Sequence, residues 1–186
     1  MNMGQDPEFV IRAATESDIP TLKSLIELSV RVLQKDDYST EQIEGALGHA
    51  LGLDTQLVRD GTYFVAAPAG RELLHAGCGG WSYRRTLFGS DHGPDREQAL
   101  LDPGVDAAKI RAIFVHPAWA RRGLGSMILK HCETAAALAG FRHFEMGSTL
   151  TGVPLYTLRG YQECGRVDVP LPNGAFLPVV RMTKAL

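Results

Sequence analysis

Short apolar runs recur along the chain and predict the strands of a sheet. Seven such runs occur, at residues 9–11, 63–67, 72–83, 108–115, 141–148, 161–169 and 176–183. The third run contains Gly77, Gly79 and Gly80. Glycines inside a strand indicate a bulge or the close approach of another backbone, so we expect an irregularity there.

Other segments carry apolar residues at helical spacing, which predicts helices. They lie at residues 17–33, 40–51, 123–139 and 153–158. Ser17 or Asp18 is suited to cap the first helix, and Pro20 suits an early helical position. The order of elements is then β-α-α-β-β-β-α-β-α-β-β. It predicts one domain over residues 1–186, of the α/β class in its α+β form, with a mixed sheet of about seven strands flanked by about four helices.

Two segments lack either pattern. Residues 84–107 contain three glycines and two prolines. A long irregular segment in a compact domain is usually functional or poorly ordered, so we expect a loop that is more mobile than the sheet and borders a binding site. The polar residues 1–8 are expected to form a flexible N-terminus.

The composition narrows the classes of function. Hydrophobic residues make up 45% of the chain and charged residues 22%, values typical of globular proteins. The net charge of −2 gives no global field that would hold a nucleic acid. No apolar run approaches the roughly 18 residues of a membrane helix. We therefore expect neither a nucleic-acid partner nor a membrane.

Cysteine and histidine spacing bears on redox and metal chemistry. Cys78, Cys132 and Cys164 are far apart and odd in number, which argues against a disulfide framework and a cysteine zinc site. The histidines show no H-x-x-x-H spacing, so we expect no metal. The first residues show no basic segment followed by an apolar one, and so no secretory signal. These features favour a cytoplasmic protein in a reducing compartment.

The segment with the clearest chemistry covers residues 113–128, where a strand, a basic turn and a long helix follow one another. Gly123 and Gly125 allow the backbone to approach a ligand, and Arg121 and Arg122 add positive charge. The first turn of a helix also offers free N–H groups, which favours a phosphate or pyrophosphate. The spacing is neither that of a Walker A loop nor G-x-G-x-x-G. The alternative, glycines that only allow tight helix–sheet packing, stays open.

This segment resembles the pyrophosphate loop of the GCN5-related N-acetyltransferase (GNAT) family. That loop has the pattern Gln/Arg-x-x-Gly-x-Gly/Ala and follows a strand that ends in Val-x-Pro. Gly123 and Gly125 match the two small positions, and Val115 with Pro117 matches the strand exit. The first position of the pattern falls on Ala120, which removes one side chain that helps to shape the loop.

A second segment supports the resemblance independently. Residues 152–161 are similar to the family's Ala-x-x-x-Tyr-x-x-x-Gly-Phe/Tyr segment after the fifth strand, with Tyr156, Gly160 and Tyr161 at the matching positions. Seven residues before the tyrosine the family often has Asn, and here Thr149 stands in its place. With the order of elements from Phe9 to Thr183, the two motifs make nearly the full chain similar to a GNAT-like acyl-CoA N-acyltransferase fold.

The resemblance implies a sheet that is splayed between its fourth and fifth strands, with acetyl-CoA bound in the gap as co-substrate and no metal. The family's pattern pairs the pantetheine with the fourth strand, as an added strand would, and rests the pyrophosphate on the loop. The corresponding residues here are Ile113, Phe114 and Val115 on the strand, then Arg121, Arg122, Gly123, Leu124, Gly125 and Ser126 on the loop, with Thr149 nearby. The implied reaction is direct attack of a primary amine on the acetyl group in a ternary complex.

Two residues are candidates for proton transfer. Tyr156 matches the family's general acid, which protonates the departing thiolate, although its position is also that of a core tyrosine. Glu145 is an acidic residue in an apolar strand, where burial would raise its pKa and make it a suitable base. Its alternative is an ion pair with Arg111 or Arg142. The amine can also arrive neutral and need no dedicated base.

Neither motif indicates which amine accepts the acetyl group. A small-molecule amine and a protein amine both fit, and a homodimer is an open alternative to a monomer. Trp81, Tyr83, Arg84 and Arg85 form an aromatic and basic cluster that either lines an acceptor pocket or is a packed Trp beside solvated arginines. A non-catalytic acyl-CoA-binding or regulatory module on the same fold is the competing function, because a fold alone does not prove activity.

Overall fold

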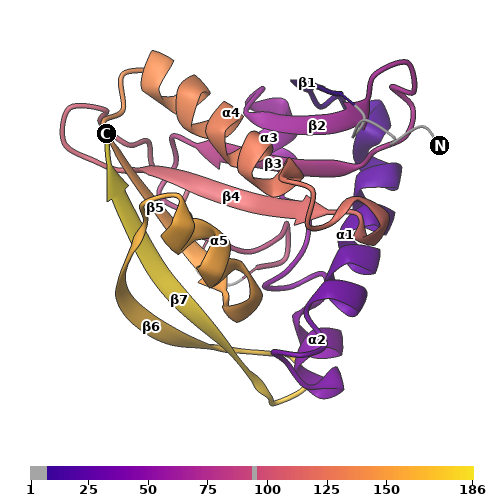
Figure 1. Cartoon of the computed structure of the whole chain (residues 1–186). Coiled ribbons are helices and arrows are strands. Elements are labelled where there is room, and N and C mark those ends of the chain that lie inside the picture. Colours follow the sequence, from indigo (N-terminus) through magenta and orange to yellow (C-terminus); the bar gives the residue numbers. More distant parts are fainter. Residues whose placement is uncertain (1–7, 94–95) are drawn as a thin grey trace.

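The computed structural model describes residues 8–93 and 96–186, which form one twisted sheet with helices on both faces (Figure 1). In this part of the chain, seven strands have the order β1-β2-β3-β4-β5-β7-β6. They are β1 (Phe9–Ala13), β2 (Tyr63–Pro68), β3 (Gly77–Ser82), β4 (Ala108–Val115), β5 (His143–Thr149), β6 (Gln162–Pro170) and β7 (Phe176–Ala185). The β4–β5 pair is parallel and the other pairs are antiparallel. The predicted mixed sheet is confirmed, while the predicted flexible N-terminus lies outside the described residues except for Glu8.

The helices divide between two apolar cores, one on each face of the sheet. Side chains of α1 (Ile19–Leu33), α2 (Thr40–Ala46) and α3 (Thr55–Arg59) belong to the first core. Side chains of α4 (Leu124–Leu138) and α5 (Val153–Leu158) belong to the second. The neighbours Phe64 and Val65 of β2 fall in different cores, because alternate side chains of a strand point to opposite faces.

The helix predicted over residues 40–51 is too long. α2 ends at Ala46, and Gly48 follows with a φ of +73°, a left-handed conformation that an α-helix does not contain. The chain then starts the short helix α3, where the side chain of Asp54 accepts a hydrogen bond from the amide of Gln56 at 3.1 Å. The described residues therefore hold five α-helices where the pattern predicted four.

The third strand is shorter than its apolar run, since residues 72–76 lie in turns and irregular backbone before β3. The irregularity that its glycines indicated is confirmed. The register between β3 and β4 shifts between Cys78 and Gly80, and Ala112 on β4 has a φ of +50°. β4 thus carries one extra residue at this point, and a bulge of this kind bends the strand that carries it.

β4 and β5 separate after a short contact, as Figure 1 shows. Their register pairs Ala108 with Phe144 and Lys109 with Glu145, and it extends no further in the described residues. From Ile110 onward, the edge of β4 that faces β5 is unpaired. The predicted splay between the fourth and fifth strands is confirmed, and it leaves backbone groups of β4 available to a ligand.

Candidate active site

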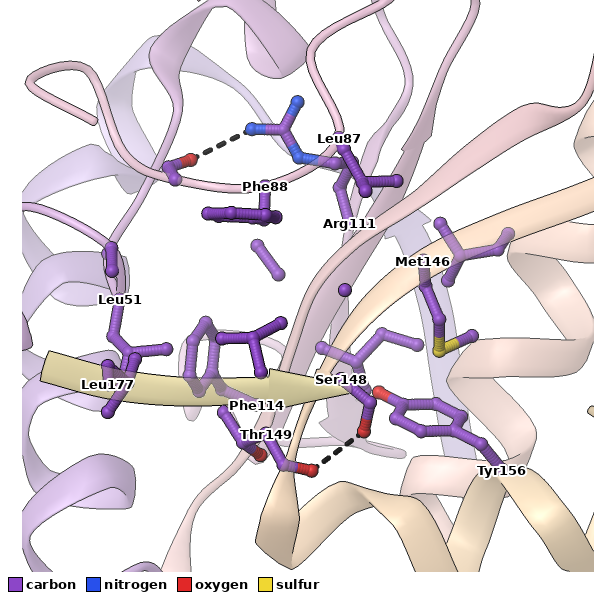
Figure 2. A pocket seen from close by; sticks show the side chains of 18 of the residues that line it. Leu51, Leu87, Phe88, Arg111, Phe114, Met146, Ser148, Thr149, Tyr156 and Leu177 are labelled. Carbon is purple, nitrogen blue, oxygen red and sulfur yellow. Dashed lines mark hydrogen bonds between the residues drawn. The ribbon is translucent and has the colours of Figure 1, made fainter. Parts of the chain in front are cut away.

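The gap between β4 and β5 opens into a pocket (Figure 2). Its cavity volume is about 70 Å³. Residues 110–114 of β4, 146–149 of β5 and 87–89 of the long loop form much of its wall. The splay and the long loop, which are distant in the sequence, therefore meet at one site.

Tyr156 reaches this pocket from α5. Its side chain is buried, and its hydroxyl points toward Ser148 and the pocket (Figure 2). Burial raises the pKa of the Tyr156 phenol well above its usual value. The hydroxyl is therefore protonated at neutral pH and is available as a hydrogen-bond or proton donor.

A glycine makes room for that tyrosine. A Cβ on Gly152 would lie 2.8 Å from the side-chain oxygen of Ser148 and 2.8 Å from the ring of Tyr156. Both distances are far below van der Waals contact, so a larger residue at Gly152 would displace the phenol. The ring of Tyr156 also makes an edge-on contact with Tyr161, with ring centroids 5.9 Å apart.

Of the three β4 residues predicted to contact the cofactor, two line the pocket and one does not. Ile113 and Phe114 line the pocket, together with Thr149 from the end of β5. Val115 lies outside the lining and pairs with Gly77 of β3. The structure thus brings two of the three predicted strand residues together with Tyr156. It places the third at the end of β4, where the chain continues into the predicted pyrophosphate loop.

The predicted pyrophosphate loop follows directly. His116 shapes its start, because the ring Nδ1 accepts a hydrogen bond from the amide of Ala118 at 3.1 Å. Arg121 and Gly123 have φ values of +64° and +81°, and α4 begins at Leu124. Left-handed residues next to a helix start orient successive amides into a concave anion site, and the helix dipole adds positive potential there.

Side chains around this loop add charge. Arg121, Arg122 and Gly123 are exposed, and the guanidinium of Arg122 lies 5.4 Å from the ring centre of Trp119. Arg159 was not predicted from the sequence, and its Nε donates to the hydroxyl of Ser126 at 3.0 Å. A third arginine from the end of α5 therefore lies beside the first turn of α4.

The two loop glycines are required for different reasons. Gly123 has open space around it but adopts a left-handed conformation. A Cβ on Gly125 would lie 3.2 Å from a methyl group of Leu155 on α5. The first glycine thus serves the backbone geometry of the loop, and the second serves close packing of α4 on α5. The packing explanation left open by the sequence therefore applies to Gly125, while phosphate binding by the loop stays a prediction.

The expected raised pKa of Glu145 is wrong. Its carboxylate pairs with Lys109 and Arg181, each at 2.5 Å. Burial on its own would raise the pKa, but the hydrogen bonds from Arg181 and Lys109 outweigh it, so the pKa is lowered. The pairing with Arg111 or Arg142 that the sequence suggested is also wrong. Glu145 lies where the splay begins and outside the pocket lining, so its role as a base stays a prediction without geometric support.

Arg111 occupies the back of the pocket and holds the long loop in place. It is 3% exposed, and its guanidinium donates to the carboxylate of Asp54 at 3.1 Å. The same guanidinium donates to the carbonyls of Thr86 and Gly89 at 2.9 and 2.8 Å. Burial lowers the pKa of Arg111 from its usual value, while Asp54 opposes that effect. This buried ion pair was not found from the sequence, although an arginine in an apolar strand requires a buried partner.

The long loop has further anchors. Arg96 donates to Asp54 at 3.1 Å and to the carbonyl of Ser90 at 2.7 Å. At its start, Arg84 pairs with Asp60 at 2.7 Å. The described part of residues 84–107 is irregular, as predicted, and borders the pocket, and several side chains anchor it. Its greater mobility relative to the sheet stays a prediction.

Within the described ranges, we find no cluster of three or more His, Cys, Asp or Glu side chains placed to hold a metal ion. None of the helices in these ranges has the length and apolar character needed to cross a membrane.

The comparisons with known proteins agree with this geometry. Residues 102–186 match the family model described as an acetyltransferase (GNAT) domain. No curated protein matches the sequence. A GCN5-related N-acetyltransferase from Rhodopseudomonas palustris superimposes with a TM-score of 0.70 at 20% identity, covering 98% of this chain and 97% of its own.

Two further solved structures are similar. The PaiA N-acetyltransferase of Thermoplasma acidophilum, in complex with coenzyme A, has a TM-score of 0.63 at 12% identity, covering 96% of this chain and 99% of its own. The ribosomal-protein-alanine N-acetyltransferase of Brucella melitensis has a TM-score of 0.61 at 19% identity, covering 95% and 99%. At these identities the likeness shows the fold, and the family match supports acyl transfer in general.

Proposed function

Because residues 102–186 match the GNAT acetyltransferase model and the fold is similar to that of solved GNAT structures, we propose that this chain is a GNAT-type, acetyl-CoA-dependent N-acetyltransferase. It transfers the acetyl group to a primary amine of a small molecule or protein by direct attack in a ternary complex. The observation that carries the proposal is the placement of the Tyr156 hydroxyl in the pocket beside the unpaired edge of β4.

The residues present fit acetyl-CoA. The open edge of β4 at Ile113 and Phe114 offers backbone groups to the pantetheine amides, as an extra strand would use them. The amides from Arg121 to Ser126 form the pyrophosphate site, with Arg121 and Arg122 supplying charge. When bound, acetyl-CoA supplies an activated acyl group in a thioester. The chain's own part is to position that group against the amine.

Tyr156 provides the proton in this mechanism. The amine nitrogen forms a bond to the acetyl carbon, the carbon–sulfur bond breaks, and the sulfur leaves as a thiolate. The phenol of Tyr156, which burial keeps protonated, donates its proton to that sulfur. The amine arrives neutral, and the proton that its nitrogen sheds as the amide forms passes through water to the Tyr156 phenolate, so the net reaction needs no carboxylate base in the pocket.

A second candidate has one observation in its favour. None of the described residues that line the pocket is Asp or Glu, and a module that binds acyl-CoA without turnover would need no such residue. Binding and turnover separate the two functions. The test is to incubate the protein with acetyl-CoA and a panel of amines, measuring thiol release and the mass of the product.

We expect thiol release to depend on the amine and to match the acetylated product. Binding of acetyl-CoA without thiol release for any amine, free amino groups of peptides included, would favour the non-catalytic module. Absence of binding would remove both candidates.

A further inference from the structure

The part of the pocket that lies away from Tyr156 is apolar. Figure 2 shows Phe88 facing Leu51, Leu177 and Phe114 across the open space. Among the described lining residues, Arg111 is the one charged side chain, and its guanidinium already bonds Asp54 and two backbone carbonyls. This half of the pocket therefore offers apolar contact and no carboxylate to an occupant.

Phe88 is fixed in position by the sheet and by the buried arginine. A Cβ on Gly147 of β5 would lie 2.7 Å from the Phe88 ring, so the ring rests directly on the glycine. On either side of it, the carbonyls of Thr86 and Gly89 accept hydrogen bonds from Arg111. A preorganised aromatic wall is a feature of sites that select a ligand by shape and apolar contact.

We propose that the acceptor is a monoamine with an aryl or branched alkyl body that packs against Phe88, Leu51 and Leu177. This inference rests on the proposed acetyl transfer and names its substrate class. Phe88 is the residue that determines specificity. A second ammonium group, as in a diamine or a lysine-rich peptide, would enter a region beside the Arg111 guanidinium that has no free carboxylate, where its desolvation is uncompensated.

The test compares phenethylamine and isoamylamine with putrescine and a lysine-containing peptide. We expect kcat/KM to favour the two apolar monoamines by at least roughly tenfold, which is the scale of discrimination by one apolar contact. Equilibrium binding of the same amines to the protein saturated with coenzyme A gives a readout that needs no turnover. Equal or stronger binding of putrescine would overturn the inference.

Variants of Phe88 test whether this residue causes the preference for apolar monoamines. Phe88→Ala is expected to raise the KM for phenethylamine by roughly tenfold or more, and to leave the KM for acetyl-CoA and for putrescine nearly unchanged. Phe88→Leu, which keeps an apolar side chain, should retain activity on isoamylamine. Phe176→Ala is the matched control, because that phenylalanine is exposed on β7.

Three results contradict the assignment of Phe88. They are equal losses for all amines, an effect of Phe176→Ala as large as that of Phe88→Ala, or better use of butyryl-CoA by Phe88→Ala with unchanged amine preference. If acetyl-CoA does not bind at all, the proposed function fails. If it binds and is turned over with putrescine alone, only the inference about the acceptor fails.

Discussion

Two loops flank β4 of the candidate site, one at each end of the strand, and they are held in place in different ways. The loop before α4 is short and exposed, and its shape comes from the backbone conformation of Arg121 and Gly123. The loop before β4 is long and irregular, and the side chain of Arg111 holds it through Asp54 and backbone carbonyls. The first belongs to the proposed cofactor site and the second to the proposed acceptor site.

Because of this difference, the two loops should tolerate different amino-acid substitutions. A loop that binds through backbone amides depends little on which side chains it carries. A loop that is held by a buried ion pair depends on residues far away in the sequence. Changes in the two loops should therefore affect different substrates, which the predictions below test.

The largest effect is expected at Tyr156, the proposed proton donor, which belongs to neither loop. Tyr156→Phe keeps the ring and removes the hydroxyl, so kcat should fall by roughly 10²–10⁴-fold, the range of general acid catalysis. Binding of acetyl-CoA should persist. The measurement is kcat under saturating amine together with the dissociation constant for acetyl-CoA.

Wild-type kcat in that variant, with chemistry rate-limiting, would remove the phenol from the mechanism. That result would not bear on the difference between the two loops, because neither loop is proposed to donate the proton.

The buried ion pair gives the next effect. Asp54→Ala leaves the Arg111 guanidinium without its carboxylate at 3% exposure. Removal of one partner from a buried pair typically costs roughly 3–5 kcal/mol of the free energy of unfolding. Urea denaturation measures that loss, and the KM for the amine should rise because the loop that carries Phe88 loses its anchor.

The paired replacement Asp54→Leu with Arg111→Met is the control. It removes both charges and should recover much of the stability, while the KM for the amine stays high because the loop carbonyls still lack a donor. A double variant that is no more stable than Asp54→Ala would show that the buried charge is not the cause.

The features that could be predicted from the sequence are those encoded within one contiguous segment. The spacing of apolar residues predicted the strands and helix α4, because each of these patterns lies within one contiguous segment. The glycine loop was recognisable for the same reason. The α2 boundary was missed, because apolar spacing continues to Leu51 while Gly48 turns the chain left-handed.

Side-chain partners were the main failure. Asp54 and Arg111 are 57 residues apart, and Glu145 meets Lys109 and Arg181 through the registers of β4 and β7. A strand residue's neighbours are set by pairing, which the spacing along one strand does not encode. The pKa of Glu145 was therefore predicted with the wrong sign, since burial was visible in the pattern and the two cations were not.

The backbone of the glycine loop provides a smaller and more selective effect. Gly123→Ala places a Cβ on a residue with a φ of +81°, which costs about 1–2 kcal/mol unless the loop changes shape. We expect weaker acetyl-CoA binding, by roughly tenfold, and an unchanged KM for the amine. Isothermal titration calorimetry and steady-state kinetics measure the two quantities.

Gly165→Ala serves as the control, because the structure has open space around Gly165 without a left-handed φ. An equal change in both KM values for Gly123→Ala would mean that the two loops are not independent.

The smallest effect concerns pH and the start of the long loop. The guanidinium of Arg84 lowers the pKa of Asp60, which is buried beside it. The pair therefore stabilises the folded state fully above the ordinary aspartate pKa of about 3.9, and this contribution is lost as the pH falls through the lowered folded-state value. Asp60→Asn should lower the denaturation midpoint at pH 7, and the gap to wild type should close below about pH 4. A gap that widens in acid would contradict the sign.

Binding of acetyl-CoA is the most direct test of the proposed cofactor site. Increasing acetyl-CoA should raise the melting temperature of the wild-type protein, because a ligand that binds only the folded chain stabilises it by linkage. Gly125→Asp, which places a carboxylate against the proposed pyrophosphate position, should remove that rise while keeping a cooperative transition of its own. A wild-type melting temperature that does not change with acetyl-CoA would contradict the assignment of the loop and of the β4 edge as its binding site.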